Sequence, residues 1–261
     1  MSAEFVNQLF GLDGQVAVVI GGTGVLGGAL AEGLGQSGAH VVVAGRNEER
    51  GQERVEAIKN LSGSAEFTTV DVSSRESIQS VCDQVIANHK QVDILINCAG
   101  VNSAVPYEEI TDEDWQKVFD GNLRATHIGC QVFAAAMASQ SQGGAILNIG
   151  SVTSHLPLSR VYAYSASKAA VVNLSQNVAR EYATQGVRVN VLCPGFFPAE
   201  QNRKILDPER VAKIMAQTPM DRFGEPSELV GAMLLLVSQQ AGSFMTGASV
   251  YVDGGFTAMR L

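Results

Sequence analysis

The sequence predicts an α/β fold: one doubly wound parallel sheet of seven strands with helices on both faces. Seven short β-type runs alternate with helical segments along the 261 residues, an alternation typical of parallel sheets. Residues 92–97 are apolar apart from Asp93, as expected for a parallel strand that is covered on both sides. The composition does not change along the chain, so we expect a single domain over residues 1–261.

The expected elements follow one another after a mixed lead-in at residues 1–14. Thr111 fits the N-cap of one helix because acidic residues follow it in the first turn. The strands are expected at residues 15–20, 40–44, 66–70, 92–97, 145–149, 187–192 and 248–252. The helices are expected directly after the glycine-rich turn at 21–28 and then at 47–61, 74–90, 111–138, 164–182, 208–217 and 227–238.

Charge and cysteine content exclude several kinds of protein. A net charge of −8 argues against a nucleic-acid surface. The cysteines at 82, 98, 130 and 193 form no CxxC pair, so we expect reduced thiols, no metal site and no disulfides. The first residues do not resemble a secretory signal, and the uncharged stretch 16–31 is shorter than the about 20 residues of a membrane span. We therefore expect a cytoplasmic protein with neither membrane nor nucleic-acid partners.

A glycine-rich turn, Gly-Gly-Thr-Gly-Val-Leu-Gly-Gly at 21–28, stands between the first expected strand and a helix. Strand, glycine-rich turn and helix form the context in which proteins bind dinucleotides. Glycine lets the backbone approach a pyrophosphate, and a helix N-terminus favours its negative charge. The alternative is a loop whose glycines only allow close packing of the helix on the sheet.

The end of the second expected strand bears on the choice of nucleotide. NAD-specific sites usually place an acid here, where it bonds the ribose hydroxyls, but this chain has Gly45 followed by Arg46. A guanidinium suits a 2′-phosphate by charge and geometry. We expect NADP(H) to be preferred and NAD(H) to be possible. The alternative is that Arg46 is an exposed loop residue.

Tyr164 and Lys168 stand four residues apart in an expected helix and therefore share one face. An ammonium beside a phenol favours the phenolate and lowers a pKa that starts at about 10. Such a tyrosine can exchange a proton with a carbonyl oxygen, and Ser151, which follows an apolar run, could bond the same oxygen. The alternative is an amphipathic surface helix with a solvated lysine.

The order of these features resembles the short-chain dehydrogenase/reductase family over nearly the whole chain. The resemblance rests on the glycine-rich turn, Asp71 after the third strand, Asn-Cys-Ala-Gly at 97–100, Asn122, Ser151, Tyr-Ser-Ala-Ser-Lys at 164–168 and a Pro-Gly at 194–195. It implies a Rossmann fold with strand order 3-2-1-4-5-6-7. It also implies a homotetramer, in which the small-residue helices after Asn122 and Tyr164 pack against a second subunit.

The family's roles carry over by position. Tyr164 would be the catalytic acid/base, Lys168 would lower its pKa and bond the nicotinamide ribose, Ser151 would polarise the carbonyl, and Asn122 would hold a water that relays protons. The nicotinamide would supply the hydride. The implied cofactor-binding residues are Gly21, Thr23, Gly24, Val25, Leu26, Gly27, Arg46, Asp71, Val72, Asn97, Ala99, Gly100, Tyr164, Lys168, Pro194, Gly195 and Phe197.

Three positions depart from the family pattern. Ile20 replaces a threonine that would tie the first strand to the 97–100 loop, and Val25 replaces a glycine beside the pyrophosphate. Ala199 replaces a threonine that bonds the nicotinamide end. These changes concern the affinity for the cofactor and leave the catalytic residues in place.

Three blocks, GGTGVLGG, PGFFPAEQNR and TPMDRFGEPSELVGA, resemble the mannonate oxidoreductase (fructuronate reductase) branch, near the gluconate 5-dehydrogenases. A sugar acid needs a cation for its carboxylate. We expect the segment around 195–225 to cover the substrate, and Arg160 and Arg203 are candidate clamps or else solvated loop arginines. His155, Gln201 and Asn202 are candidate hydroxyl partners, and Ser151 would meet the carbonyl.

Two other functions stay open. A β-ketoacyl thioester reductase would share the fold and the four catalytic positions, but its acidic carrier protein would favour a basic rim and this chain is acidic. A degenerate member could bind a dinucleotide as a sensor or structural subunit, although Asn122, Ser151, Tyr164 and Lys168 are all present.

Overall fold

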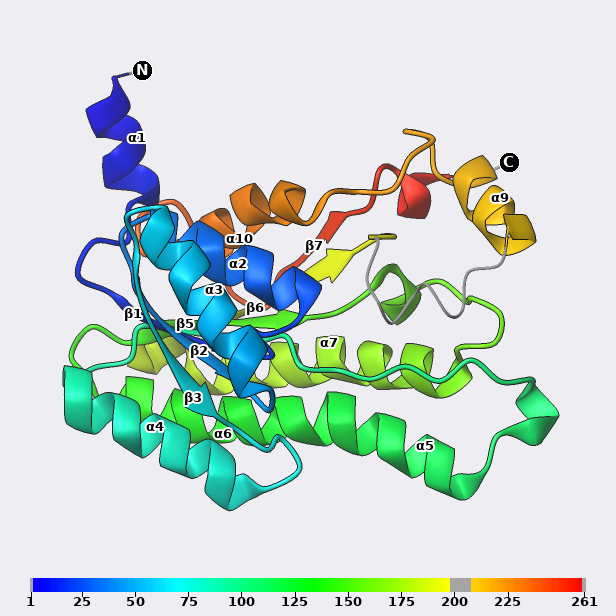
Figure 1. Ribbon diagram of the computed structural model, residues 1–261, viewed down its shortest axis with the longest axis horizontal. Coiled ribbons are helices and arrows are strands. Elements are labelled where there is room, and N and C mark those ends of the chain that lie inside the picture. Colours follow the sequence, from blue (N-terminus) through cyan, green and yellow to red (C-terminus); the bar gives the residue numbers. More distant parts are fainter. Residues whose placement is uncertain (1, 198–207, 260–261) are drawn as a thin grey trace.

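The computed structural model describes residues 2–197 and 208–259. Its centre is a seven-stranded parallel sheet in the order β3-β2-β1-β4-β5-β6-β7, which confirms the predicted order (Figure 1). Every strand differs from its predicted range by at most two residues at either end. The strands are β1 (Val16–Ile20), β2 (His40–Gly45), β3 (Ser64–Thr69), β4 (Ile94–Asn97), β5 (Gly144–Ile149), β6 (Val187–Pro194) and β7 (Ser249–Val252).

Helices α2 (Val25–Gln36), α3 (Glu48–Asn60) and α10 (Val230–Val237) cover one face of the sheet and are drawn above it in Figure 1. Their apolar side chains pack against alternate side chains of the strands, because successive side chains of a strand point to opposite faces. This core contains Leu30, Leu34, Ile58, Met233 and Leu236 from the helices and Val19, Val41, Val43 and Ile94 from the strands.

Helices α4 (Arg75–His89), α6 (Ala125–Ala138) and α7 (Tyr162–Tyr182) cover the other face and lie below the sheet in the same view (Figure 1). Their core contains Ile78, Val81, Phe133, Met137 and Ala179, packed against Val18, Val42, Leu95 and Ile146. The one charged residue of the predicted fourth strand is buried but bonded, since Asp93 accepts hydrogen bonds from Val16 N (2.7 Å) and Gln91 Nε2 (2.8 Å).

Two local features differ from the sequence-based expectation. The lead-in forms a helix, α1 (Ala3–Phe10), which Ser2 caps by accepting from Phe5 N and which extends away from the sheet (Figure 1). The helix expected at 111–138 is divided into α5 (Asp112–Phe119) and α6 by a π-helical turn, Asp120–Arg124. Thr111 caps α5 as predicted, with its side chain accepting from Asp114 N.

The remaining helical segments are short. Helix α9 (Pro208–Ala216) lies near its expected range, and a 3-10 turn, Pro226–Leu229, leads into α10. Further 3-10 turns are Tyr107–Glu109, Val152–Ser154, Ala183–Gln185 and Phe256–Ala258. In the described parts of the chain, no helix combines the length and apolar character needed to cross a membrane.

The carboxyl ends of the parallel strands meet at one edge of the sheet, which is where ligands bind in open α/β folds. At this edge Cys98 N donates to Ile20 O (2.9 Å) and Gly21 N donates to Ala44 O (2.9 Å). The end of β1 is therefore tied to β2 and to the 97–100 loop through its backbone, even though Ile20 offers no side-chain hydroxyl and buries its side chain.

Candidate active site

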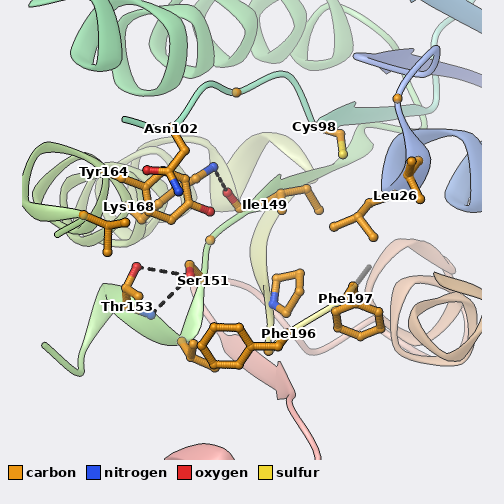
Figure 2. Close-up of a pocket in the computed structure, with 18 of the residues that line it drawn as sticks. Leu26, Cys98, Asn102, Ile149, Ser151, Thr153, Tyr164, Lys168, Phe196 and Phe197 are labelled. Carbon is orange, nitrogen blue, oxygen red and sulfur yellow. Dashed lines mark hydrogen bonds between the residues drawn. The ribbon is translucent and has the colours of Figure 1, made fainter. Parts of the chain in front are cut away.

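A cavity opens at this edge, between the glycine-rich turn, the ends of β4, β5 and β6, and helix α7 (Figure 2). Ser151, Tyr164 and Lys168 all line it, together with Gly21, Gly24 and Gly100. The structure therefore brings the three predicted reacting side chains to the same space as the predicted cofactor turn. The other predicted residues that line it are Val25, Leu26, Gly27, Pro194, Gly195 and Phe197.

Tyr164 and Lys168 lie in the first two turns of α7 and face the cavity (Figure 2). Lys168 is buried, and its Nζ lies 5.7 Å from the centre of the Tyr164 ring. Nζ also donates a hydrogen bond of 2.7 Å to Ile149 O at the end of β5. The ammonium is thus held across the face of the phenol ring and against the end of the strand.

The expected lowering of the Tyr164 pKa by Lys168 is wrong for the protein alone. Burial raises the pKa of Tyr164 to about 12, while its hydrogen bond with Ser151 opposes this shift. Burial also lowers the pKa of Lys168 to about 8, because no carboxylate offsets the desolvation of its ammonium. Of this pair, Lys168 has the pKa nearer neutrality.

Ser151 is fixed by its neighbours at the start of the 3-10 turn Val152–Ser154. Its Oγ accepts hydrogen bonds from Thr153 N (3.2 Å) and from Thr153 Oγ1 (3.1 Å) (Figure 2). Two accepted bonds fill the lone pairs of the hydroxyl and leave its proton for donation. The proton of Ser151 can therefore point to the Tyr164 oxygen or to a carbonyl beside it. Thr153 lines the cavity and was missed by the sequence analysis.

Asn122 is fully buried in the π turn between α5 and α6. Its side chain accepts from Val101 N (2.7 Å) and donates to Val101 O (3.0 Å) and Ser167 Oγ (3.0 Å). A Cβ atom placed on Gly100 would lie 3.1 Å from Asn122 Oδ1 and 3.7 Å from Lys168 Nζ. Asn122 therefore ties the loop after β4 to the helix of Tyr164, and Gly100 keeps the space between Asn122 and Lys168 open.

The glycine-rich turn forms a backbone cradle under the cavity. Gly21 has a φ of +89°, and a Cβ there would come within 2.6 Å of Ala99 N; a Cβ on Gly27 would strike Gly21 O. Helix α2 begins after Gly24 with no capping side chain and no acid in its first turn, so its first N–H groups face the cavity edge without a side-chain acceptor. This arrangement fits a pyrophosphate. Val25 adds a side chain, 38% exposed, at the rim.

A second cavity continues from the first, and the two share Gly21, Gly24, Cys98 and Gly100. Asp71 accepts from Ser73 N (2.9 Å) and Ser73 Oγ (2.7 Å), and these bonds hold its pKa below the usual value. This cavity is lined by the predicted residues Thr23, Arg46, Asp71, Val72 and Ala99. Together the two cavities provide an elongated trough that fits a dinucleotide. Asn97 lies behind it, buried and donating to Asn148 Oδ1 (2.8 Å).

Gly45 packs closely against Thr23 beside this second cavity. A Cβ there would lie 2.6 Å from Thr23 Cγ2, so a carboxylate could not occupy the position without displacing Thr23. Arg46 follows as an exposed residue and lines the cavity. The surroundings of the predicted 2′-phosphate position thus lack an acid at residue 45 and contain a guanidinium at residue 46.

The far side of the first cavity is where a substrate would lie. Phe196 and Phe197 follow β6 and point into it (Figure 2). Arg210 of α9 also lines it, and its Nη2 donates to Ser159 O (2.8 Å). The helix around Arg210 was predicted from the sequence, but the orientation that turns Arg210 toward the cavity was not. Other lining residues that it missed are Asn102, Val152, Leu158 and Val161.

Two of the predicted substrate residues lie away from this lining. Arg160 is exposed with a φ of +67°, in the turn before α7. His155 is exposed, with its ring 5.7 Å from that of Tyr251. Neither lines the cavity, so the expectation that they contact the substrate is not supported by their positions. Ala199, Gln201, Asn202 and Arg203 lie outside the described residues.

Known proteins resemble this chain over nearly its whole length. A family model described as Enoyl-(Acyl carrier protein) reductase matches residues 23–257. The uncharacterised oxidoreductase UxuB of Bacillus subtilis is 35% identical, covering 95% of this chain and 96% of the relative. Gluconate 5-dehydrogenase of Gluconobacter oxydans is 34% identical, covering 96% and 97%.

A solved structure shows the same architecture. The gluconate 5-dehydrogenase from Burkholderia cenocepacia in complex with NADP and tartrate superposes with a TM-score of 0.92 at 31% identity, covering 98% of this chain and 100% of that chain. Gluconate 5-dehydrogenases are therefore among the similar proteins. The mannonate oxidoreductase branch is not singled out by these similar proteins.

Proposed function

The chain belongs to the short-chain dehydrogenase/reductase family of oxidoreductases, and on that premise we propose that it interconverts a keto and a hydroxy sugar acid with NADP(H) preferred over NAD(H). The observation that carries the chemistry is the meeting of Ser151, Tyr164 and Lys168 at one end of the glycine-lined trough. A cofactor held there would have its reactive end beside the only groups needed for proton transfer to a carbonyl.

Different residues of the trough would bind different parts of the cofactor. The first turn of α2 and the backbone around Gly21 would hold the pyrophosphate. Asp71 and Val72 would meet the adenine, and Arg46 would pair with a 2′-phosphate. Lys168 and the segment Pro194–Phe197 would hold the nicotinamide end. The nicotinamide, when bound, supplies or accepts the hydride.

The chain's own residues transfer the proton. Ser151, with both lone pairs engaged by Thr153, donates its proton to the carbonyl oxygen and fixes its position. Tyr164, with a pKa of about 12, remains a phenol at neutral pH and gives its proton to that oxygen during reduction. Lys168, with a pKa of about 8, is the adjacent group able to restore or remove the proton. Asn122 holds the loop and helix that frame this exchange.

An anionic, polyhydroxylated substrate matches the described lining. Lys168 and Arg210 are the cations among the described residues of the cavity, and Thr153 and Asn102 offer hydrogen bonds beside them. Arg210 stands across the cavity on α9, where it could receive a carboxylate while the carbonyl meets Tyr164. The names of the similar gluconate 5-dehydrogenases support the same class. Apolar side chains, among them Leu158, Phe196 and Phe197, also line the cavity, so the support for an anionic substrate comes from the two cations and the similar proteins.

Steady-state assays test the substrate class. Purified protein is offered NADPH or NADH with keto sugar acids, neutral ketoses and a β-ketoacyl thioester. We expect kcat/KM to be at least about tenfold higher for a keto acid than for the neutral analogue, because a bond to a charged group is worth about 1.5–3 kcal/mol. Turnover of the thioester alone would favour the acyl reductase, and binding of cofactor without any turnover would favour a sensor.

The Arg210→Met variant tests whether Arg210 binds the carboxylate of the substrate. We expect KM for the keto acid to rise at least about tenfold while the neutral ketose changes less than about twofold. Arg180→Met, at an exposed position late in α7, is the matched control and should change neither. Equal losses on acid and neutral substrates would mean that Arg210 only positions the loop through Ser159, and the sugar-acid assignment would fail.

We also propose that the chain forms a homotetramer. The outer surface of α6 and α7, the helices after Asn122 and Tyr164, carries small and apolar side chains, among them Ala135, Ala169 and Leu174. A second copy packed there would cover it, as closed two-fold symmetry allows. Light scattering at micromolar concentration should give four times the mass of one chain, 27.6 kDa. A monomer would refute the proposal.

A further inference from the structure

A second cluster of ligand-forming side chains lies away from the active site. It consists of His40, Glu66 and His89, whose candidate ligand atoms all lie within 4.8 Å of one another. His40 is the first residue of β2, so the cluster lies toward the amino ends of the strands, opposite the edge that holds Tyr164. Residues so far apart in the sequence form no motif, and the sequence analysis expected no metal.

The sheet register and helix α4 bring the three side chains together. β2 and β3 pair with His40 opposite Ser64 and Val42 opposite Glu66, so His40 and Glu66 point to the same face. His89 ends α4, which covers that face, and its ring lies 4.4 Å from the ring of His40. Three different elements therefore contribute one ligand each.

The distances are close to those of a coordination shell. Glu66 Oε1 lies 2.9 Å from His89 Nε2 and 3.8 Å from His40 Nε2. Ligands bonded at about 2.0–2.1 Å in a tetrahedron stand about 3.3 Å apart. Side-chain rotations that move the two Nε2 atoms and the carboxylate oxygen by about 1 Å would place them around one ion. The side chains are 26%, 42% and 22% exposed for His40, Glu66 and His89, which leaves one side for water and for entry.

One nitrogen of His40 makes no hydrogen bond within the described residues, and its charged neighbour is Glu66 Oε1 at 3.8 Å. The Nδ1 of His40 bonds Ser64 Oγ at 2.8 Å, whereas Nε2 is shielded from solvent and has no hydrogen-bond partner among the described residues. A buried unpartnered nitrogen is costly. When Nδ1–H donates to Ser64, the lone pair of Nε2 points into the cluster, which is the arrangement in which a second neighbour orients a metal-binding histidine.

The chemical types of the three side chains also suit a cation. Two imidazoles with one carboxylate match zinc and its neighbours better than magnesium or calcium, which prefer oxygen ligands.

We propose that His40 Nε2, His89 Nε2 and the Glu66 carboxylate bind one Zn²⁺ ion, with water completing the coordination. The ion joins β2, the edge strand β3 and the end of α4. Its role is to stabilise this corner of the fold, because it lies at the opposite end of the strands from Ser151, Tyr164 and Lys168. The nicotinamide chemistry does not depend on it.

Calorimetric titration of untagged protein, first treated with EDTA and dialysed, tests the site. We expect one Zn²⁺ per chain with Kd below about 10 µM, and a Tm higher by about 5 °C at a hundredfold excess over Kd. Mg²⁺ should produce neither effect. His40→Gln and His89→Gln should each weaken Zn²⁺ binding at least about tenfold and, at the same Zn²⁺ concentration, reduce the rise in Tm by about half or more. His127→Gln, at an exposed histidine on α6, is the matched control and should retain both.

Circular dichroism in EDTA verifies that each variant is folded. Glu66→Gln, which changes only the charge of a 42% exposed side chain, is the second variant should a histidine variant fail to fold, and it should also weaken binding at least about tenfold. Absence of saturable binding below about 100 µM would overturn the proposal. So would Zn²⁺ binding that persists in His40→Gln, His89→Gln and Glu66→Gln alike, or that is lost in His127→Gln.

Discussion

Thr153 is predicted to act on the reaction only through Ser151. Its Oγ1 donates to Ser151 Oγ at 3.1 Å and its N–H donates at 3.2 Å, so Ser151 has its own proton free for the carbonyl. Thr153→Val keeps the shape and the backbone bond and removes the hydroxyl. Ser151 Oγ could then turn its proton elsewhere and would be held less firmly.

The size of the effect follows from one neutral hydrogen bond. Such a bond is worth about 0.5–1.5 kcal/mol, which corresponds to a loss of about 2- to 13-fold in kcat. Cofactor affinity should be unchanged, because Thr153 lies on the substrate side of the cavity. Steady-state kinetics give kcat, and a fluorescence titration with NADPH gives the Kd.

Two variants separate positioning from general damage. Thr153→Ser restores the hydroxyl and should recover most of the lost kcat. Thr246→Val is the control: it removes a hydroxyl that accepts from Val189 N at 3.1 Å, near the other end of β6. It should leave kcat unchanged even where it lowers stability. The reasoning is refuted if Thr153→Val turns over normally, or if Thr153→Ser is as impaired as Thr153→Val.

Two further predictions concern the cofactor and the proton. Arg46→Ala should weaken NADP(H) at least about tenfold and NAD(H) less than about twofold, since the bond to a charged phosphate is worth about 1.5–3 kcal/mol; equal losses in Kd would mean that Arg46 does not contact the phosphate. Burial lowers the pKa of Lys168 to about 8, so Lys168 is mostly protonated below that value and loses its proton as the pH rises through it. The kcat for alcohol oxidation should therefore rise with pH through about 8 and level off above it, and a flat profile from pH 6 to 9 would contradict this role.

The fold could be predicted because its signals are local. Most of the parallel strands are apolar runs, such as 92–97, and most are followed by turn residues and then a helical pattern. The exception in that run, Asp93, is stabilised by Val16 N on the neighbouring strand, a contact that no local pattern shows. Helix α1 did have a signal, with Ser2 as cap and apolar Phe5, Val6, Leu9 and Phe10 at helical spacing.

The candidate site likewise contains residues that the sequence predicts and residues that only the tertiary structure reveals. Ser151, Tyr164 and Lys168 stand in recognisable order, and the structure gathers them in one cavity. Thr153 and Arg210 were not predicted to line the cavity. Their positions depend on how the turn after β5 and helix α9 pack in the tertiary structure, which no local sequence pattern shows. The predicted direction of the Tyr164 pKa shift was wrong because the sequence shows the neighbouring Lys168 but not the burial of Tyr164, which raises its pKa.

The proton donor is the centre of the account, and Tyr164→Phe tests it most directly. The variant keeps the ring against Lys168 and deletes the one hydroxyl that gives a proton to the carbonyl. We expect kcat to fall by about two orders of magnitude or more, within the range of general acid–base catalysis, while the Kd for NADPH changes less than about twofold. A Tyr164→Phe variant that binds NADPH and reduces the substrate at the wild-type rate would contradict the account.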